Sequence, residues 1–169
     1  DVKSRSLTLP DRHPLVLRSP TPEDAAALLA YVRALHHAAY QNLMRPADGF
    51  DHVTVAEEAT VITRFANHPA SFFLCAFDGH EIVSAVNIGQ DAIPSQAHGG
   101  TLGMGVLPAW QGCGLGKAML ARALEVATDA GMWHVKLFVR TGNLPAIALY
   151  EGQGFRRVGL IAAATIVDG

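Results

Sequence analysis

The sequence predicts a single domain of mixed α and β structure (α/β, in the α+β sense), and three observations support this. Strand-like and helix-like patterns alternate along the chain, without an internal repeat or a linker. The length of 169 residues suits one domain. Half of the residues are hydrophobic, which is enough for a buried core. We assign residues 14–169 to this domain and residues 1–13 to an N-terminal lead-in.

The composition disfavours several classes of protein. Lys and Arg number 13 against 15 Asp and Glu, so nothing general attracts nucleic acid or an anionic membrane. No apolar run reaches the roughly 20 residues of a membrane span, and the first residues lack a signal-peptide core. Cys75 and Cys113 form no disulfide framework, and the histidines show no metal-ligand spacing, so no metal site is predicted. We therefore expect a cytoplasmic protein.

Local signals in the N-terminal half predict a strand, two helices and a hairpin. Residues 13–18 form a short strand candidate, and Thr21 is placed to cap the helix that follows. The apolar face of this helix repeats at helical spacing: Ala25, Leu28, Leu29 and Val32. Thr54 and Glu57 form a capping box for the second helix. Asp78-Gly79 lies between two apolar runs, which is typical of a hairpin.

The C-terminal half alternates in the same way. Residues 99–106 form a glycine-rich strand, and a helical pattern follows the loop behind it until Gly131. Residues 134–140 alternate like a strand. A short helix starts at Asn143, and residues 155–161 form the last clear strand candidate.

The glycine-rich loop before the third helix resembles a phosphate-binding loop, yet it fits neither common nucleotide motif. Gly112 and Gly116 enclose three residues where a P-loop has four, and Ala118 replaces the hydroxyl residue that holds magnesium. Lys117 and Met119 stand where a dinucleotide fingerprint needs its third glycine.

What remains is Gln-x-x-Gly-x-Gly at residues 111–116. Glycines let a ligand approach the backbone, and the N–H groups of a helix start attract a pyrophosphate. A tight strand-to-helix turn without a ligand is the alternative.

Two motifs connect the chain with a known family. Gln111, Gly114 and Gly116 match the acetyl-CoA motif of the GNAT superfamily of N-acetyltransferases. The family's Asn-x-x-Ala-x-x-Leu-Tyr-x-x-x-Gly-Phe pattern recurs at Asn143, Ala146, Leu149, Tyr150, Gly154 and Phe155. Because both motifs occur in the family's order, the chain resembles this superfamily over roughly residues 14–165, most weakly before Gly99.

The resemblance implies a twisted mixed sheet of roughly six or seven strands flanked by about four helices. This sheet is splayed between the strands at 99–106 and 134–140, where acetyl-CoA binds as co-substrate. The cofactor-binding residues it implies are Met104, Val106, Leu107, Gln111, Gly112, Cys113, Gly114, Leu115, Gly116, Lys117, Asn143 and Tyr150. Family members continue past a turn like "VDG" into a final strand. Here the sequence ends at that turn, so the strand is absent or is supplied by a partner chain, as in a homodimer.

The resemblance also implies a direct attack of a primary amine on the thioester. A backbone N–H near Met104 to Val106 stabilises the oxyanion, and Tyr150 protonates the departing thiolate as the general acid. The chemistry is consistent, because a tyrosine with a pKa of about 10 is protonated at neutral pH. Tyr150 as an ordinary core residue and Asn143 as a helix cap remain alternatives. The general base is unassigned, with His98 and Asp91 the nearest ionisable residues.

Glycines 99, 100, 103 and 105 have two interpretations: room for substrate beside the strand, or a bulged strand. For the whole protein, the alternative to an enzyme is a non-catalytic acyl-CoA-binding or sensory module. A cysteine hydrolase built on Cys113 lacks an identifiable His/Asn pair. The sequence does not identify the amine acceptor.

Overall fold

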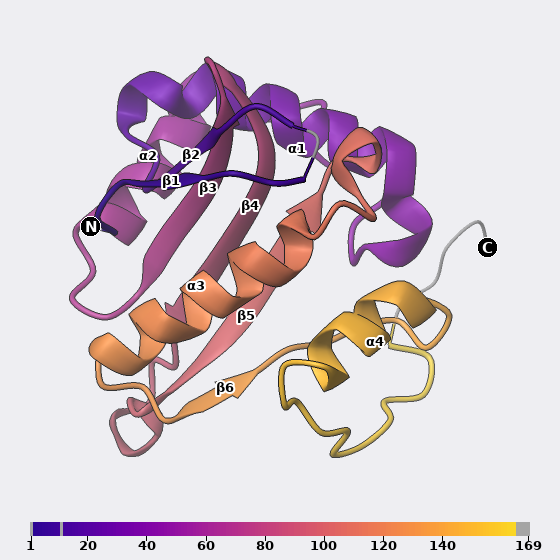
Figure 1. The fold of residues 1–169 in the computed structure, drawn as a ribbon. Coiled ribbons are helices and arrows are strands. Elements are labelled where there is room, and N and C mark those ends of the chain that lie inside the picture. The colour runs from indigo at the N-terminus through magenta and orange to yellow at the C-terminus, as the bar shows by residue number, and fades with distance from the viewer. Residues whose placement is uncertain (1, 11, 165–169) are drawn as a thin grey trace.

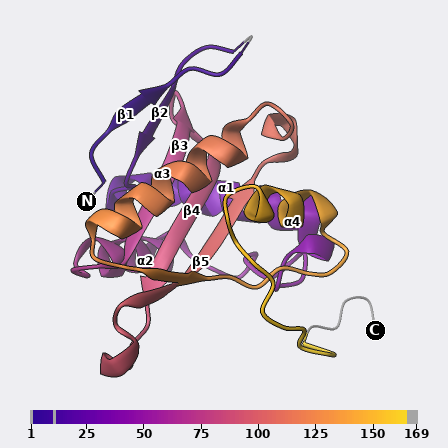
Figure 2. The same cartoon turned by 60° about the horizontal axis from the view of Figure 1, so that its bottom comes forward.

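A computed structural model describes residues 2–10 and 12–164, which form a six-stranded sheet with helices on both faces (Figures 1 and 2). The strands are β1 (Arg5–Leu7), β2 (Leu15–Arg18), β3 (Phe72–Asp78), β4 (Glu81–Gln90), β5 (Gly99–Val106) and β6 (His134–Lys136). They neighbour one another in chain order, antiparallel up to β5, and β6 runs parallel to β5. The predicted mixed sheet is therefore confirmed.

The helices divide between the two faces of the sheet. They are α1 (Ala25–Ala39), α2 (Val55–Ala66), α3 (Leu115–Asp129) and α4 (Leu144–Glu151). In Figure 1, α3 crosses the sheet in front, α1 and α2 lie behind it, and α4 stands beyond its β6 end. Within the described residues, no helix combines the length and apolarity needed to cross a bilayer.

Each face of the sheet has its own apolar core. On the α3 face, the buried helix residues are Leu115, Met119, Leu120, Ala123 and Ala127, and they pack with Leu74, Val86 and Ile88 of the sheet. On the other face, α1 and α2 contribute Leu28, Tyr31, Leu35 and Ile62, which pack with Phe73, Cys75 and Phe77. Both faces of the sheet are therefore covered by helices that bury apolar side chains against it.

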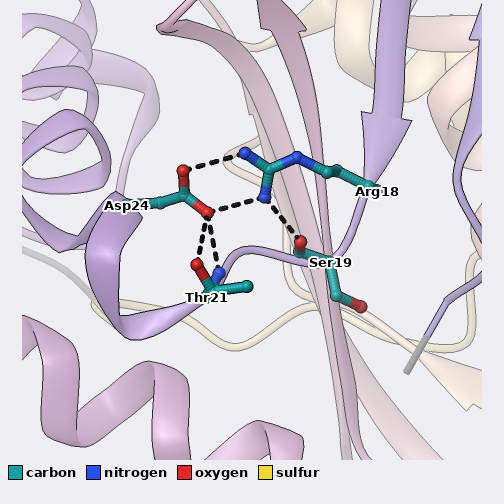
Figure 3. A network of polar contacts seen from close by, with 4 residues as sticks. All are labelled: Arg18, Ser19, Thr21 and Asp24. Carbon is teal, nitrogen blue, oxygen red and sulfur yellow. Dashed lines mark hydrogen bonds and ion pairs between the residues drawn. The ribbon is translucent and has the colours of Figure 1, made fainter.

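Figure 3 shows how the first helix is attached to the sheet. Arg18 at the end of β2 donates two hydrogen bonds to the carboxylate of Asp24, at 2.6 and 2.8 Å. The backbone N–H and the hydroxyl of Thr21 also donate to this carboxylate. The Arg18 guanidinium holds the pKa of Asp24 below its usual range. Thr21 is followed by a 3-10 turn at Pro22–Asp24 that leads into α1 at Ala25, so the helical segment starts near the predicted place, one turn ahead of α1 itself. The capping box of Thr54 and Glu57 is present at α2.

The structure differs from the sequence interpretation at both ends of the chain. The lead-in contains β1, whose Arg5 and Leu7 pair with Leu17 and Leu15 of β2; three residues are too few for a recognisable strand pattern.

Residues 155–161 form no strand, and Val158 is fully exposed. A strand needs a neighbour for its backbone groups, and no described strand pairs with this segment. The turn at residues 166–169, on which the expected final strand depends, lies outside the described residues.

Candidate functional site

The site begins where β5 and β6 separate. The two strands pair only at Gly99 with His134, Gly100 with Val135 and Thr101 with Lys136. β5 then continues to Val106, whereas the strand predicted at 134–140 ends at Lys136. Figure 1 shows the chain leaving β5 after β6, on its way to α4. Residues 102–106 of β5 therefore have an edge that no described strand covers, which is the predicted splay.

The register shows which backbone groups face this opening. The N–H of Leu107 donates to the Val83 carbonyl and that of Asp91 to the Gly99 carbonyl, so odd-numbered residues of β5 bond to β4. Peptide groups alternate along a strand. Met104 and Val106 therefore direct their N–H and C=O groups toward the opening.

Leu107 differs from the other two strand residues predicted to bind the cofactor. Its N–H donates to Val83, and its carbonyl accepts the N–H of Trp110 at 2.8 Å. Its N–H is thus used within the protein, and its carbonyl already accepts one hydrogen bond, so Leu107 has no free donor for the pantetheine pairing expected there. Val106 keeps a free N–H, because only its carbonyl is engaged, by the side chain of Gln111 at 3.0 Å. Gln111 ties the loop to the end of β5.

The loop after β5 presents backbone N–H groups. Gly112 and Gly114 have φ angles of 74° and 90°, which side-chain-bearing residues rarely adopt. A Cβ atom at either position would meet no atom within 4 Å, so this side of the loop is open. Among the described residues, no N–H from Gly112 to Lys117 donates to a protein acceptor. These groups and the positive end of the α3 dipole form an anion-binding arrangement.

The remaining loop residues have distinct positions. Leu115 is fully buried and anchors α3 in the core, whereas Lys117 is exposed on the first helical turn. The thiol of Cys113 donates to the Trp110 carbonyl at 3.0 Å, which occupies it within the loop. A Cβ at Gly116 would lie 3.4 Å from Leu149 of α4 and 3.6 Å from Val106. Gly116 therefore lies where α3, α4 and β5 meet, and a Cβ there would make ordinary van der Waals contacts.

Helix α4 carries the predicted general acid. Asn143 caps this helix, since its side-chain oxygen accepts the N–H of Ala146 at 3.3 Å. Tyr150 is partly buried against the α3-side core, and its ring lies 5.8 Å from that of Phe155. Burial raises the pKa of Tyr150, so the hydroxyl remains protonated at neutral pH. No hydrogen bond joins this hydroxyl to another described residue.

Two glycines of β5 allow close packing inside the protein instead of leaving room for substrate. A Cβ at Gly100 would lie 2.6 Å from Ile88, and one at Gly105 would collide with Leu35. Gly100 and Gly105 thus allow close packing within the protein and leave no room for substrate, whereas Gly103 is exposed and a Cβ there would lie no closer than 3.5 Å, from Asn87. The alternative of a bulged strand is wrong, because the β4–β5 register is continuous; the irregularity lies between β3 and β4, at Ala76 and Phe77.

The two ionisable residues nearest in sequence lie at the closed end of the splay. The Asp91 carboxylate pairs with Lys136 at 2.8 Å, and the His98 ring packs at 4.8 Å from that of Trp133. Both flank Gly99, and a strand rises roughly 3.3 Å per residue, which separates them from Val106 by about 20 Å. In the part of the chain described, no group of three His, Cys, Asp or Glu is arranged to hold a metal ion.

Sequence reasoning missed Tyr31 and Ser84, whose buried hydroxyls contact the backbone of Gly105 beside this opening. Tyr31 lies on the apolar face of α1, and Ser84 lies in β4 between the apolar residues Val83 and Ala85. No local pattern distinguishes either from a core residue.

The open edge of β5 lies beside the glycine loop and the N-terminus of α3. This arrangement suits an extended, anionic ligand. The model of the acetyltransferase (GNAT) family matches residues 32–155. This chain therefore belongs to the acetyltransferase (GNAT) family.

Individual relatives agree with this assignment. The mycothiol acetyltransferase of Acidothermus cellulolyticus is 38% identical over 102 residues, which cover 54% of this chain and 31% of that protein. The chain thus matches less than a third of the length of that relative. A GNAT-family acetyltransferase structure from Streptococcus pneumoniae is 29% identical with a TM-score of 0.76, and the match covers 86% of both chains. Mycobacterium smegmatis RimJ, in complex with CoA-disulfide, shares the fold at 24% identity and a TM-score of 0.76, covering 98% of this chain and 81% of RimJ.

Proposed function

We propose that this protein is an acetyl-CoA-dependent N-acetyltransferase that acetylates a primary amine. The observation that carries the proposal is the meeting of three elements at Gly116: the open edge of β5, the N–H groups of the loop, and helix α4 with Tyr150. Family membership and the CoA-disulfide complex of RimJ support this proposal.

The proposed ligand contacts follow from the groups that are free. The pyrophosphate of acetyl-CoA accepts hydrogen bonds from the loop N–H groups between Gly112 and Gly116, and the exposed Lys117 adds a positive charge. The pantetheine arm lies along β5 and pairs with the main chain of Met104, while the N–H of Val106 is kept for the reacting carbonyl. Its thioester then reaches the part of the opening next to α4.

The proposed reaction needs an oxyanion donor and an acid. The neutral amine attacks the thioester carbonyl carbon, and the Val106 N–H donates to the oxygen that becomes negative. The carbon–sulfur bond then breaks, and the Tyr150 hydroxyl gives its proton to the departing thiolate. The nitrogen of the new amide loses its extra proton to solvent, and solvent returns a proton to the tyrosinate, which completes the cycle. Because burial raises the pKa of Tyr150, its hydroxyl carries a proton throughout the neutral pH range and is available as the acid.

A second candidate is a non-catalytic acyl-CoA-binding or sensory module. The observation that favours it is the position of Asp91 and His98, which lie at the closed end of the splay and are remote from Val106. Such a module would bind acetyl-CoA through the same loop without turnover.

Release of the CoA thiol tests the two candidates. The purified protein is incubated with acetyl-CoA and with polyamines, amino acids, aminoglycosides or peptides that carry free N-termini. An amine-dependent release above the hydrolysis measured without amine supports the enzyme. Binding of acetyl-CoA without release for any amine class supports the sensory module, and the absence of binding contradicts both.

A further inference from the structure

The carbonyl oxygen of Gly105 receives two side-chain hydrogen bonds inside the protein. The Tyr31 hydroxyl donates to it at 2.8 Å, and the Ser84 hydroxyl donates at 2.9 Å. Tyr31 also accepts the N–H of Ala85 at 3.2 Å, so its oxygen bridges β4 and β5. Both donors are buried, with Tyr31 4% exposed and Ser84 not exposed. The carbonyl is therefore held from helix α1 and from the neighbouring strand.

This carbonyl belongs to the same peptide group as the N–H of Val106. Peptide groups are planar, and the described chain contains no cis peptide bond. In a trans peptide the C=O and N–H point in opposite directions. Because the Gly105 oxygen points toward its two donors, the Val106 N–H points into the opening between β5 and β6. Fixing one end of this peptide fixes the other.

The contacts to this carbonyl matter more because residue 105 is a glycine. A Cβ atom there would collide with Leu35 and lie 2.8 Å from the Tyr31 oxygen, so glycine is required for α1 to approach. Glycine restricts its own backbone less than any other residue. The pairing of Gly105 with Ala85 restrains this peptide group within the sheet, and the two hydroxyls restrain its carbonyl further.

The two hydroxyls also affect the strength of the donor. A hydrogen bond accepted by a carbonyl polarises its amide group, which makes the attached N–H a better donor. Burial raises the pKa of Tyr31, so its hydroxyl keeps the proton that it donates. Packing alone would be met by phenylalanine in place of Tyr31, because the surrounding side chains are apolar.

We propose that Tyr31 and Ser84 are positioning residues for acetyl transfer: they hold the Gly105–Val106 peptide so that the Val106 N–H donates to the oxyanion. This inference rests on the proposed function. It assigns a task to two buried hydroxyls that touch neither acetyl-CoA nor the amine.

The test compares Tyr31→Phe and Ser84→Ala with Ser71→Ala. Ser71 accepts the N–H of Gln90 at 2.9 Å, so it forms a similar contact to β4 at the end remote from Val106. For each variant we would measure kcat, the Kd for acetyl-CoA, the Tm, and the amide resonance of Val106 in 15N-labelled protein. If Tyr31→Phe fails to fold, Ser84→Ala, which removes a single oxygen atom, carries the test.

We expect kcat to fall about tenfold or more in both variants, a smaller loss than the 10²–10³ known for deleting an oxyanion donor. The Kd for acetyl-CoA should change less than about twofold, and the Val106 amide proton should move upfield because its peptide is less polarised. Ser71→Ala should retain kcat and the Val106 resonance.

An unchanged kcat in both variants, with chemistry rate-limiting, overturns the proposal. So does an equal loss in Ser71→Ala, which would indicate a general effect on the sheet. The amide resonance needs no turnover, which separates this inference from the proposed function. If the wild-type protein transfers no acetyl group to any amine, the proposed function fails, and an unmoved Val106 resonance then also overturns the positioning.

Discussion

Thr101 on β5 and Lys136 on β6 form the last pair between these strands, and the splay opens directly after it. The side chain of Lys136 also pairs with Asp91 at 2.8 Å, beside the turn that leads from β4 into β5. The closed end of the opening is therefore fixed by both a backbone ladder and an ion pair.

Replacing Tyr150 with phenylalanine should lower kcat and leave acetyl-CoA affinity nearly unchanged. The ring and its packing on Phe155 are retained, and only the hydroxyl that protonates the thiolate is lost. General acid catalysis contributes about 10²–10⁴-fold, so a fall of that size is expected. Steady-state kinetics with an accepted amine and a direct binding titration check this. A wild-type rate with chemistry rate-limiting would assign Tyr150 to the core alone.

The raised pKa of Tyr150 also predicts how kcat depends on pH in the alkaline range. Burial raises the pKa of Tyr150, so its acid form persists beyond the ordinary value of about 10 and is lost only as the pH rises through the raised value. We expect no descending limb of kcat due to Tyr150 below about pH 10. A limb below that pH that disappears in the phenylalanine variant would be incompatible with this role.

Two glycines of β5 should respond differently to alanine. At Gly105 the new Cβ would meet Leu35 and Tyr31, whereas at Gly103 the nearest atom, from Asn87, lies 3.5 Å away. Neither glycine has a positive φ, so backbone strain does not separate them. We expect Gly105→Ala to lower the free energy of unfolding by about 1–3 kcal/mol, as overpacking does. Gly103→Ala should stay within about 0.5 kcal/mol in urea denaturation, and equal effects would contradict the packing described.

Replacing Asp24 with asparagine should destabilise the protein in a pH-dependent way. Arg18 lowers the pKa of Asp24, so this carboxylate stabilises the fold above its unfolded pKa of about 4, and the effect is lost as the pH falls through the lowered value. Loss of two charge-assisted hydrogen bonds costs about 1–3 kcal/mol, or roughly 2–9 °C in Tm, near pH 7. The difference from the wild type should shrink as the pH falls below the unfolded pKa of about 4 and through the lowered pKa of Asp24.

The control for this variant is Glu151→Gln, which removes an exposed ion pair with Arg157. Exposed pairs contribute little, about 0–1 kcal/mol. A difference at Asp24 that is equally small, or that is independent of pH, would show that the contact with Arg18 does not anchor α1.

Local signals predicted the features that depend on neighbouring residues. The caps at Thr21, Thr54 and Asn143 and the strand before the loop follow from residues a few positions apart. The lengths of β1 and β6 depend instead on which strand lies alongside. The engagement of Leu107 by Val83 depends on register, and the contacts of Tyr31 with Gly105 join residues 74 positions apart. A single sequence carries no local pattern for such contacts.

Two glycine variants test whether acetyl-CoA binds at the N–H groups before α3. Gly114 and Gly131 flank the same helix, both have a positive φ, and a Cβ at either meets no atom within 4 Å. Gly114→Glu and Gly131→Glu therefore introduce the same strain and charge, but only the first reaches the proposed pyrophosphate site. In a calorimetric titration with acetyl-CoA, we predict that Gly131→Glu binds like the wild type and that Gly114→Glu binds at least about tenfold more weakly, ~1.4 kcal/mol. Wild-type affinity for acetyl-CoA in a folded Gly114→Glu protein would show that the pyrophosphate does not bind at this loop.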